Sequence, residues 1–369
     1  MLGLILPLLL IVFCAYVIWR AGDSFIDGSN YIGRNLHDGV KGATINAVAS
    51  SMPELFISMF FLFYLKDLSG FSGGVGTSFG SVLFNALIIP SVSILGVLSK
   101  SKKTHVKISK KLVIRDGLWL IFVQLLLIYF IQQKEIGWLE SLILILIYCL
   151  YVFYLFKTMR GGHKIDYEAP FSEKEKVSLL SSFVIFDLKR ILLGNKKLNS
   201  KTAWFIFGVS SFIIGVVCYF LVLACEWLGS ETYFLPLFGE LTGLGIPLLF
   251  IALIFSAIGS SFPDSIISYK DAQRGNYDDA VSNAYGSNIF NLCVALGGPL
   301  FVYTLYNGTI VLTDELVLLI SSISYWFLGL NIISILTYIY GEGVNRIRSY
   351  FLIFLYLVFV LFVFYSASL

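Results

Sequence analysis

The sequence predicts an all-α integral membrane protein with about ten transmembrane helices, arranged as two inverted repeats of five helices each. Composition is the first reason, because 57% of the 369 residues are hydrophobic and only 13% are charged, far too apolar for a soluble domain. The second reason is that apolar residues form continuous runs of roughly 20, the length that crosses a bilayer as a helix. The third is that part of the chain occurs twice, in the same order. Continuous rather than alternating runs also exclude an outer-membrane β-barrel.

Ten apolar runs define the expected spans and the two halves of the chain. They lie near residues 2–19, 39–65, 73–98, 112–133, 136–157, 203–225, 243–269, 278–303, 314–340 and 347–367. The first five form an N-terminal half, 1–157, and the last five a C-terminal half, 203–369. A polar loop, 158–202, joins them, and its residues 183–193 predict either an amphipathic interfacial helix or a simple linker. The first run lacks the basic start and the cleavage site of a signal peptide, so we expect a retained helix.

The positions of the basic residues predict the orientation in the membrane. If the N-terminus lies outside, the loops after the odd-numbered spans hold 24 of the 26 lysines and arginines, and only Lys66 and Lys134 lie elsewhere. Because basic loops stay in the cytoplasm, we expect both termini outside, loop 158–202 in the cytoplasm, and a location in the plasma or inner membrane. The five cysteines lie in or beside predicted spans and the three histidines in loops, which argues against disulfides and against a zinc site in the membrane.

One short pattern occurs twice, about 210 residues apart, inside apolar stretches. The first copy is Ala-Ser-Ser-Met-Pro-Glu at 49–54, and the second is Gly-Ser-Ser-Phe-Pro-Asp at 259–264. Each copy ends in an acid, Glu54 or Asp264, and a carboxylate at membrane depth costs several kcal/mol unless a cation offsets that cost. Two such acids at matched positions therefore predict a cation site.

The similarity extends beyond the two acidic motifs. It covers about residues 39–90 and 245–299, because the helix at 79–85 is also matched, by residues 285–291. Five spans separate the two copies, so they cross the membrane in opposite directions. Transporters with this arrangement hold their substrate near the midplane and expose it alternately to either side.

Polar residues lie along one face of each repeated helix, at steps of three or four. The members of these stripes are Ala47, Ser51, Glu54 and Ser58; Ala257, Ser261, Asp264 and Ser268; Thr77, Ser81 and Asn85; and Asn283, Ser287 and Asn291. Pro53 and Pro263 have no N–H, which frees the carbonyl four residues earlier for an ion. Gly73, Gly74, Gly76 and Gly80 allow a neighbouring helix to approach closely.

The groups collected on these stripes are carboxylate, hydroxyl, amide and carbonyl oxygens. Hard oxygen ligands suit Ca²⁺ and Na⁺. Two carboxylates neutralise one Ca²⁺ or two Na⁺, so any further Na⁺ makes the exchange electrogenic. We therefore expect Ca²⁺ and Na⁺ as transported substrates in a lipid bilayer, with no cofactor, no nucleic acid and no obligatory protein partner.

The two copies resemble the alpha repeats of the sodium/calcium exchanger family, within the cation/calcium antiporter superfamily. The family pattern is Gly-Thr-Ser-x-Pro-Glu/Asp, followed by a helix with Gly-Ser-x-x-x-Asn/Asp. The resemblance implies that Glu54 and Asp264 are the central ligands of Ca²⁺ and Na⁺. It further implies side-chain or carbonyl oxygens from Ser50, Ser51, Ser260 and Ser261, backbone carbonyls from Ala47 and Ala257, and second-helix oxygens from Ser81, Asn85, Ser287 and Asn291.

The chain departs from the family pattern at several positions. Ser50 and Ser260 replace Thr, and Ala49 replaces Gly. Asn291 stands where potassium-dependent members carry Asp, so the resemblance implies Na⁺/Ca²⁺ antiport without K⁺. The long cytoplasmic loop is too short for the calcium-sensing domains of the animal exchangers.

Three other functions compete with this prediction. A Ca²⁺/H⁺ antiporter of the same superfamily is the nearest, but serine-rich motifs and the pair Asn85 and Asn291 offer few protonatable groups and favour sodium. An intramembrane aspartyl protease also uses two acids, but its Gly-x-Gly-Asp pattern is absent and one acid here is Glu, so we expect no enzyme. An ion channel is disfavoured because inverted repeats with proline-broken helices fit alternating access.

Overall fold

The computed structural model describes residues 1–33, 47–101, 103–158, 182, 185–194 and 198–367. The helices of the first half are α1 (Leu2–Ile32), α3 (Ala47–Ser50), α4 (Met52–Phe60), α5 (Asp67–Leu83), α6 (Ile89–Lys100), α7 (Lys110–Gln132) and α8 (Trp138–Thr158). Those that follow are α10 (Leu188–Leu193), α11 (Ser200–Gly229), α12 (Leu248–Ile251), α13 (Ala257–Ser260), α14 (Phe262–Gln273), α15 (Tyr277–Phe290), α16 (Gly297–Asn307), α17 (Asp314–Ile339) and α18 (Arg346–Ala367).

In the described part of the chain, four π-helical segments interrupt the motif-bearing helices. They are η2 (Phe61–Leu65), η3 (Phe84–Ile88), η4 (Ala252–Ser256) and η5 (Asn291–Leu296). Each joins two α-helical segments or ends one, and Asn85 and Asn291 both lie in the first turn of such a segment. Single π turns inside helices leave main-chain groups less regularly paired and are frequent at functional sites.

The predicted fold class is confirmed, since the chain is a multi-pass helical membrane protein. Within the described residues, eight helical segments are long and apolar enough to cross a bilayer, and a ninth is the pair 248–260 and 262–273, bent by 45°. The expected span 39–65 lies partly outside the described residues, and its described part ends in a shorter apolar helix, Met52–Leu65. Helix α1 runs well beyond the predicted end at residue 19.

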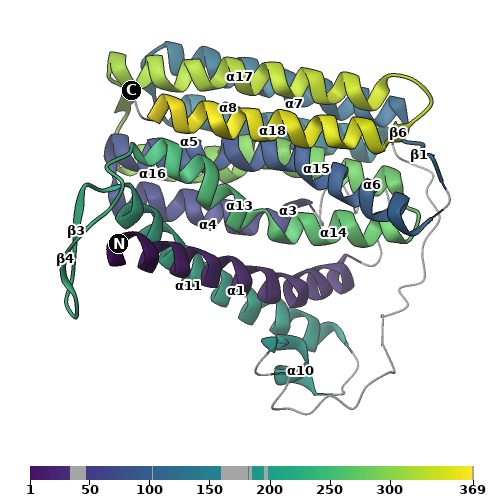
Figure 1. Cartoon of the computed structure of the whole chain (residues 1–369), viewed down its shortest axis with the longest axis horizontal. Coiled ribbons are helices and arrows are strands. Elements are labelled where there is room, and N and C mark those ends of the chain that lie inside the picture. Colours follow the sequence, from purple (N-terminus) through teal and green to yellow (C-terminus); the bar gives the residue numbers. More distant parts are fainter. Residues whose placement is uncertain (34–46, 102, 159–181, 183–184, 195–197, 368–369) are drawn as a thin grey trace.

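Figure 1 shows the helices in layers. Helices α1 and α11 pack side by side along one face of the bundle, and α17, α18, α7 and α8 cover the opposite face. The motif-bearing helices α3 to α6 and α13 to α16 lie between them. Both termini lie at the same end of the bundle. The repeated helices are therefore enclosed by protein on two sides, which keeps their polar stripes away from lipid.

Among the described residues, three short antiparallel strand pairs lie in the loops at the ends of the bundle. β1 (His105–Val106) pairs with β6 (Val344–Asn345), β2 (Glu135–Ile136) with β5 (Ile310–Val311), and β3 (Thr232–Leu235) with β4 (Gly239–Thr242). The first two pairs join a loop of the N-terminal half to a loop of the C-terminal half. The two halves are thus linked outside the membrane-spanning part as well as within it.

The described end of the central loop packs against protein. Of the predicted segment 183–193, residues 183–184 lie outside the described residues, and the remainder contains the six-residue α10. Arg20 Nε of α1 donates to the Ile185 carbonyl at 2.6 Å, and Lys189 Nζ lies 2.6 Å from Asp27 Oδ2. Polar contacts thus hold the described part of this segment against α1, and its two interpretations, a membrane-surface helix or a linker, stay predictions.

Candidate ion-binding site

Both acidic motifs fold as broken helices. Helix α3 ends at Ser50 and α4 begins at Met52, with Ser51 between them at φ −95° and ψ 10°. In the second repeat Ser261 separates α13 from α14 at φ −82° and ψ 5°. The proline after each break occupies the first turn of the new helix, where its missing N–H is tolerated. The matched sequences thus produce matched backbone breaks, each just before an acid.

Asp264 is a fully buried carboxylate surrounded by donors. It is 0% exposed, and its Oδ1 accepts from Ser287 Oγ at 2.7 Å and from Asn283 Nδ2 at 3.5 Å. Its Oδ2 accepts from Asn85 Nδ2 at 3.3 Å, and Ser50 also hydrogen-bonds this carboxylate. Asn85 and Ser50 belong to the first repeat, whereas Ser287 and Asn283 belong to the second. The Asp264 carboxylate therefore lies at the interface between the repeats.

Glu54 is equally buried but less completely paired. It is 0% exposed, and its Oε1 accepts from Ser261 Oγ at 3.2 Å, with Ser260 as a further partner. Its Oε2 has no hydrogen-bond partner among the described residues. Asp264 lies close enough for the two negative charges to repel each other. A cation between these acids would remove the repulsion and occupy the unpaired oxygen.

Serine pairs connect the first helix of each repeat to the second helix of the other. Ser50 Oγ lies 3.3 Å from Ser287 Oγ, and Ser81 Oγ lies 3.2 Å from Ser260 Oγ. These are the same pair seen twice, because position 50 corresponds to 260 and position 81 to 287. All four side chains are 0% exposed. The repeats interlock, so that neither contains a complete site by itself.

The expected carbonyl ligands already accept hydrogen bonds. The Ala47 carbonyl accepts from Ser51 N at 3.1 Å and Ser50 Oγ at 3.3 Å. The Ala257 carbonyl accepts from Ser261 N at 3.1 Å and from Ser260 Oγ at 3.1 Å. Both carbonyls therefore lie among the serines of the site, and Ala257 also accepts from Ser81 Oγ at 3.5 Å.

Several buried polar atoms of the four polar stripes lack a partner among the described residues. They are Ser51 Oγ, Glu54 Oε2, Ser58 Oγ, Asn85 Oδ1, Asn283 Oδ1, and Asn291 Oδ1 and Nδ2. An unpaired buried polar atom costs about 1–3 kcal/mol, so each of these atoms calls for a partner, as do buried atoms outside the stripes such as those of Gln124 and Tyr148. Six of the seven atoms are oxygens, the ligand type that Ca²⁺ and Na⁺ take. These oxygen ligands fit hard cations as substrates.

Hydrogen bonds join most of the residues predicted from the sequence to this cluster, and Asn291 is the exception. Asn291 is 0% exposed, yet neither of its amide atoms has a partner among the described residues, unlike its counterpart Asn85. Asn283 contacts Asp264 but was recognised only as part of a stripe. Ser256, which accepts from Thr77 Oγ1 at 2.9 Å, was missed because it lies outside the matched motif.

Glycines on α5 allow the close packing that the site needs. A Cβ at Gly76 would lie 3.1 Å from Ala252 Cβ, and one at Gly80 would overlap the Leu253 carbonyl and lie 2.5 Å from Ala257 Cβ. The expected close approach of a neighbouring helix is therefore observed. It brings Ser81, next to Gly80, within reach of the second repeat.

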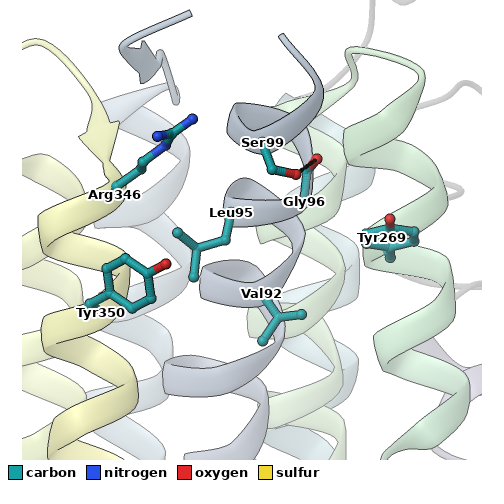
Figure 2. A pocket seen from close by; sticks show the side chains of 7 residues that line it. All are labelled: Val92, Leu95, Gly96, Ser99, Tyr269, Arg346 and Tyr350. Atoms are coloured by element: carbon teal, nitrogen blue, oxygen red, sulfur yellow. Dashed lines mark hydrogen bonds between the residues drawn. The ribbon is translucent and has the colours of Figure 1, made fainter.

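A surface pocket lies between α6, α14 and α18. It has a volume of about 520 Å³ and is lined by Val92, Leu95, Gly96, Ser99, Tyr269, Arg346 and Tyr350. Figure 2 shows Tyr269 on one side of α6 and Arg346 with Tyr350 on the other. None of the residues of the ion cluster lines this pocket, so it is separate from the candidate site.

Known proteins share this sequence pattern. The family model described as "Sodium/calcium exchanger protein" matches residues 6–157 and 202–365. Sodium/potassium/calcium exchanger 3 of Homo sapiens is 34% identical over 148 residues, which cover 38% of this chain and 22% of that protein. Sodium/potassium/calcium exchanger 5 of Homo sapiens is 24% identical over 83% of this chain and 72% of that one. The chain thus spans about a fifth of the length of the first of these relatives.

Solved structures share the fold. Native YfkE has a TM-score of 0.63 at 16% identity and covers 98% of this chain and 92% of its own. The H⁺/Ca²⁺ exchanger CAX has a TM-score of 0.57 at 14% identity, covering 99% and 87%. The sodium-calcium exchanger NCX_Mj has a TM-score of 0.54 at 17% identity, covering 96% and 97%. With the family model matching most of its length, the chain belongs to the sodium/calcium exchanger family.

Proposed function

We propose that this protein is a secondary active antiporter that moves Ca²⁺ out of the cytoplasm in exchange for Na⁺, by alternating access. The observation that carries the proposal is the pair of buried acids, Glu54 and Asp264, which come from opposite repeats and share one cluster of oxygen ligands. Family membership sets aside the protease alternative, because the family consists of transporters and not enzymes.

The charge balance of the site supports an exchange of Ca²⁺ for Na⁺. Two carboxylates neutralise one Ca²⁺ or two Na⁺, and both acids are withdrawn from water, so an uncompensated charge is costly. Any Na⁺ beyond two carries net charge across the membrane. We therefore propose an electrogenic exchange driven by inward Na⁺, with Glu54 and Asp264 as ligands and the surrounding serines and asparagines as further oxygens.

The counter-ion proposal rests on the residues around the acids. Ser50, Ser81, Ser260 and Ser287 supply hydroxyl oxygens in two matched pairs. Asn85 and Asn291 are neutral amides, so the described part of the cluster holds two carboxylates rather than three or four. Sodium is favoured over protons for that reason, and the neutral Asn291 supports exchange without K⁺. The proposed orientation places both termini outside, in the plasma or inner membrane.

The test is Ca²⁺ uptake into proteoliposomes that contain the purified protein. Vesicles loaded with Na⁺ and diluted into Na⁺-free medium should take up Ca²⁺ at constant pH, with or without K⁺. A proton gradient without Na⁺ should drive no uptake, and an inside-positive potential should accelerate Na⁺-driven uptake. Uptake that follows only the proton gradient identifies a Ca²⁺/H⁺ antiporter instead, and a requirement for K⁺ contradicts the role given to Asn291.

A further inference from the structure

A third buried acid lies outside the ion cluster. Asp116 of α7 is 0% exposed, and Arg115 holds it in a two-pronged ion pair with Nε–Oδ1 at 2.7 Å and Nη2–Oδ2 at 2.9 Å. Tyr151 of α8 donates to the same carboxylate at 3.2 Å, and Ser282 of α15 donates at 3.3 Å. With its charge paired and both oxygens engaged, Asp116 has no capacity left for a transported ion.

The position of Ser282 connects this network to the ion cluster. Ser282 precedes Asn283, whose amide donates to Asp264 Oδ1 at 3.5 Å and to Ser268 Oγ at 3.4 Å. Both distances are at the long limit of a hydrogen bond, so a small rotation or shift of α15 would lose them. The same helix carries Ser287, which makes the shortest contact to Asp264. The position of α15 therefore determines whether Asn283 and Ser287 can donate hydrogen bonds to Asp264.

Other contacts among the described residues also hold α15, and Tyr285, two residues after Asn283, places its hydroxyl 3.3 Å from Ser334 Oγ of α17. Asp278 accepts from Ser109 N at 2.7 Å at the start of the helix, and Asn288 donates to the Val82 carbonyl at 3.1 Å beyond it. The contact between Ser282 and Asp116 holds the turn that presents Asn283. The negative charge of the acceptor favours this contact, although 3.3 Å is long for a hydrogen bond between a hydroxyl and a carboxylate.

We propose that Asp116 is a positioning residue for the ion site: through Ser282 it fixes α15 so that Asn283 and Ser287 reach Asp264. This inference rests on the proposed Ca²⁺ transport. A buried ion pair contributes little net stability because desolvation offsets its attraction, whereas it can specify one arrangement of the helices around it. Arg115 neutralises the acid, so that its hydrogen bond to α15 does not require a buried net charge.

The sharpest test is Ser282→Ala, which removes the tether and leaves the ion pair of Arg115 and Asp116 intact. We expect the half-saturating Ca²⁺ concentration of uptake to rise by about threefold to tenfold, the effect of one hydrogen bond to a charged group that is only partly lost. The maximal rate and the thermal unfolding midpoint should stay near those of the wild type. Ser282→Thr keeps the hydroxyl and should restore the affinity.

Ser324→Ala is the matched control. Ser324 is 0% exposed like the site serines, but its Oγ donates at 2.6 Å to the Ile320 carbonyl of its own helix, α17. It should leave the half-saturating Ca²⁺ concentration unchanged. An unchanged value in Ser282→Ala overturns the positioning role, as does an equal effect in the control. Direct Ca²⁺ binding to the purified wild type separates the two proposals, because absence of binding there overturns the proposed transport itself.

Discussion

Replacing Glu54 by Gln should weaken Ca²⁺ binding strongly without weakening the fold. The substitution keeps the size of the side chain and removes one negative charge from a 0% exposed position. In the wild type Glu54 is repelled by Asp264, and its Oε2 has no partner among the described residues. The ion-free variant therefore loses no favourable contact of Oε2 and is relieved of the repulsion, so its thermal unfolding midpoint should not fall.

The expected loss of affinity follows from the charge balance of the site. With Glu54 neutral, a bound Ca²⁺ leaves one positive charge uncompensated in a buried cluster. Removing one partner of a buried ion pair costs about 3–5 kcal/mol. Since about 1.4 kcal/mol is a tenfold change, Ca²⁺ affinity should fall by roughly a hundredfold to a few thousandfold.

Thermal unfolding in detergent, with and without Ca²⁺, measures this difference directly. At a Ca²⁺ concentration of about 100 times its Kd, the wild type gains about 2.7 kcal/mol of stability, whereas Glu54→Gln at the same concentration gains about 0.4 kcal/mol or less. Na⁺-driven Ca²⁺ uptake in proteoliposomes should be lost in parallel. The control is Glu140→Gln, because Glu140 accepts from Gly137 N at 2.9 Å in the first turn of α8, outside the site. A variant at position 54 that still shows the full Ca²⁺-dependent stabilisation would refute the ligand role.

Three other substitutions test separate parts of the structure. Asp264→Asn should abolish Ca²⁺ uptake for the same charge reason while folded protein is still recovered, and retained flux would remove this acid from the mechanism. Asn291→Asp adds a titratable group to the cluster, so Ca²⁺ uptake should depend more steeply on pH than in the wild type; an identical pH profile would place Asn291 outside the ion path. Gly80→Ala should destabilise the protein by about 1–3 kcal/mol in thermal unfolding through overlap with α13 and η4. Gly298→Ala, where a Cβ meets nothing within 4 Å, should not.

The membrane spans could be predicted because burial in lipid constrains composition directly, but their ends could not. Hydropathy falls at Arg20, yet α1 continues to Ile32 because the segment beyond Arg20 is held by protein and not by lipid. Gly22 packs against Pro263 of α14, where a Cβ would come to 3.0 Å. Contacts with the second repeat, which no local pattern reveals, stabilise this extension.

The acids and their neighbours could be predicted from the repeated motif, because the matching positions and prolines are local. The partners across repeats could not, since a pair such as Ser50 and Ser287 depends on how two distant helices cross. Asp116 was missed for a different reason. The count of basic residues assigned its neighbour Arg115 to a loop, whereas the structure places Arg115 in α7 with its side chain only 16% exposed. The sequence did contain a signal for Asp116, because an acid and an arginine stand next to each other inside a predicted span.

The two half-sites match in sequence but differ in their hydrogen bonds. Asn85 donates to Asp264, whereas its counterpart Asn291 has no partner among the described residues. Ser261 donates to Glu54, whereas the hydroxyl of its counterpart Ser51 is unpaired there too. The carboxylate of Asp264 is thus satisfied by protein, and that of Glu54 is only partly satisfied. An arriving cation gains a new contact at Glu54 but must replace existing donors at Asp264. Each substitution removes one negative charge, but the two have different effects on the ion-free site. Asp264→Asn disturbs the hydrogen bonds of that site, whereas Glu54→Gln does not.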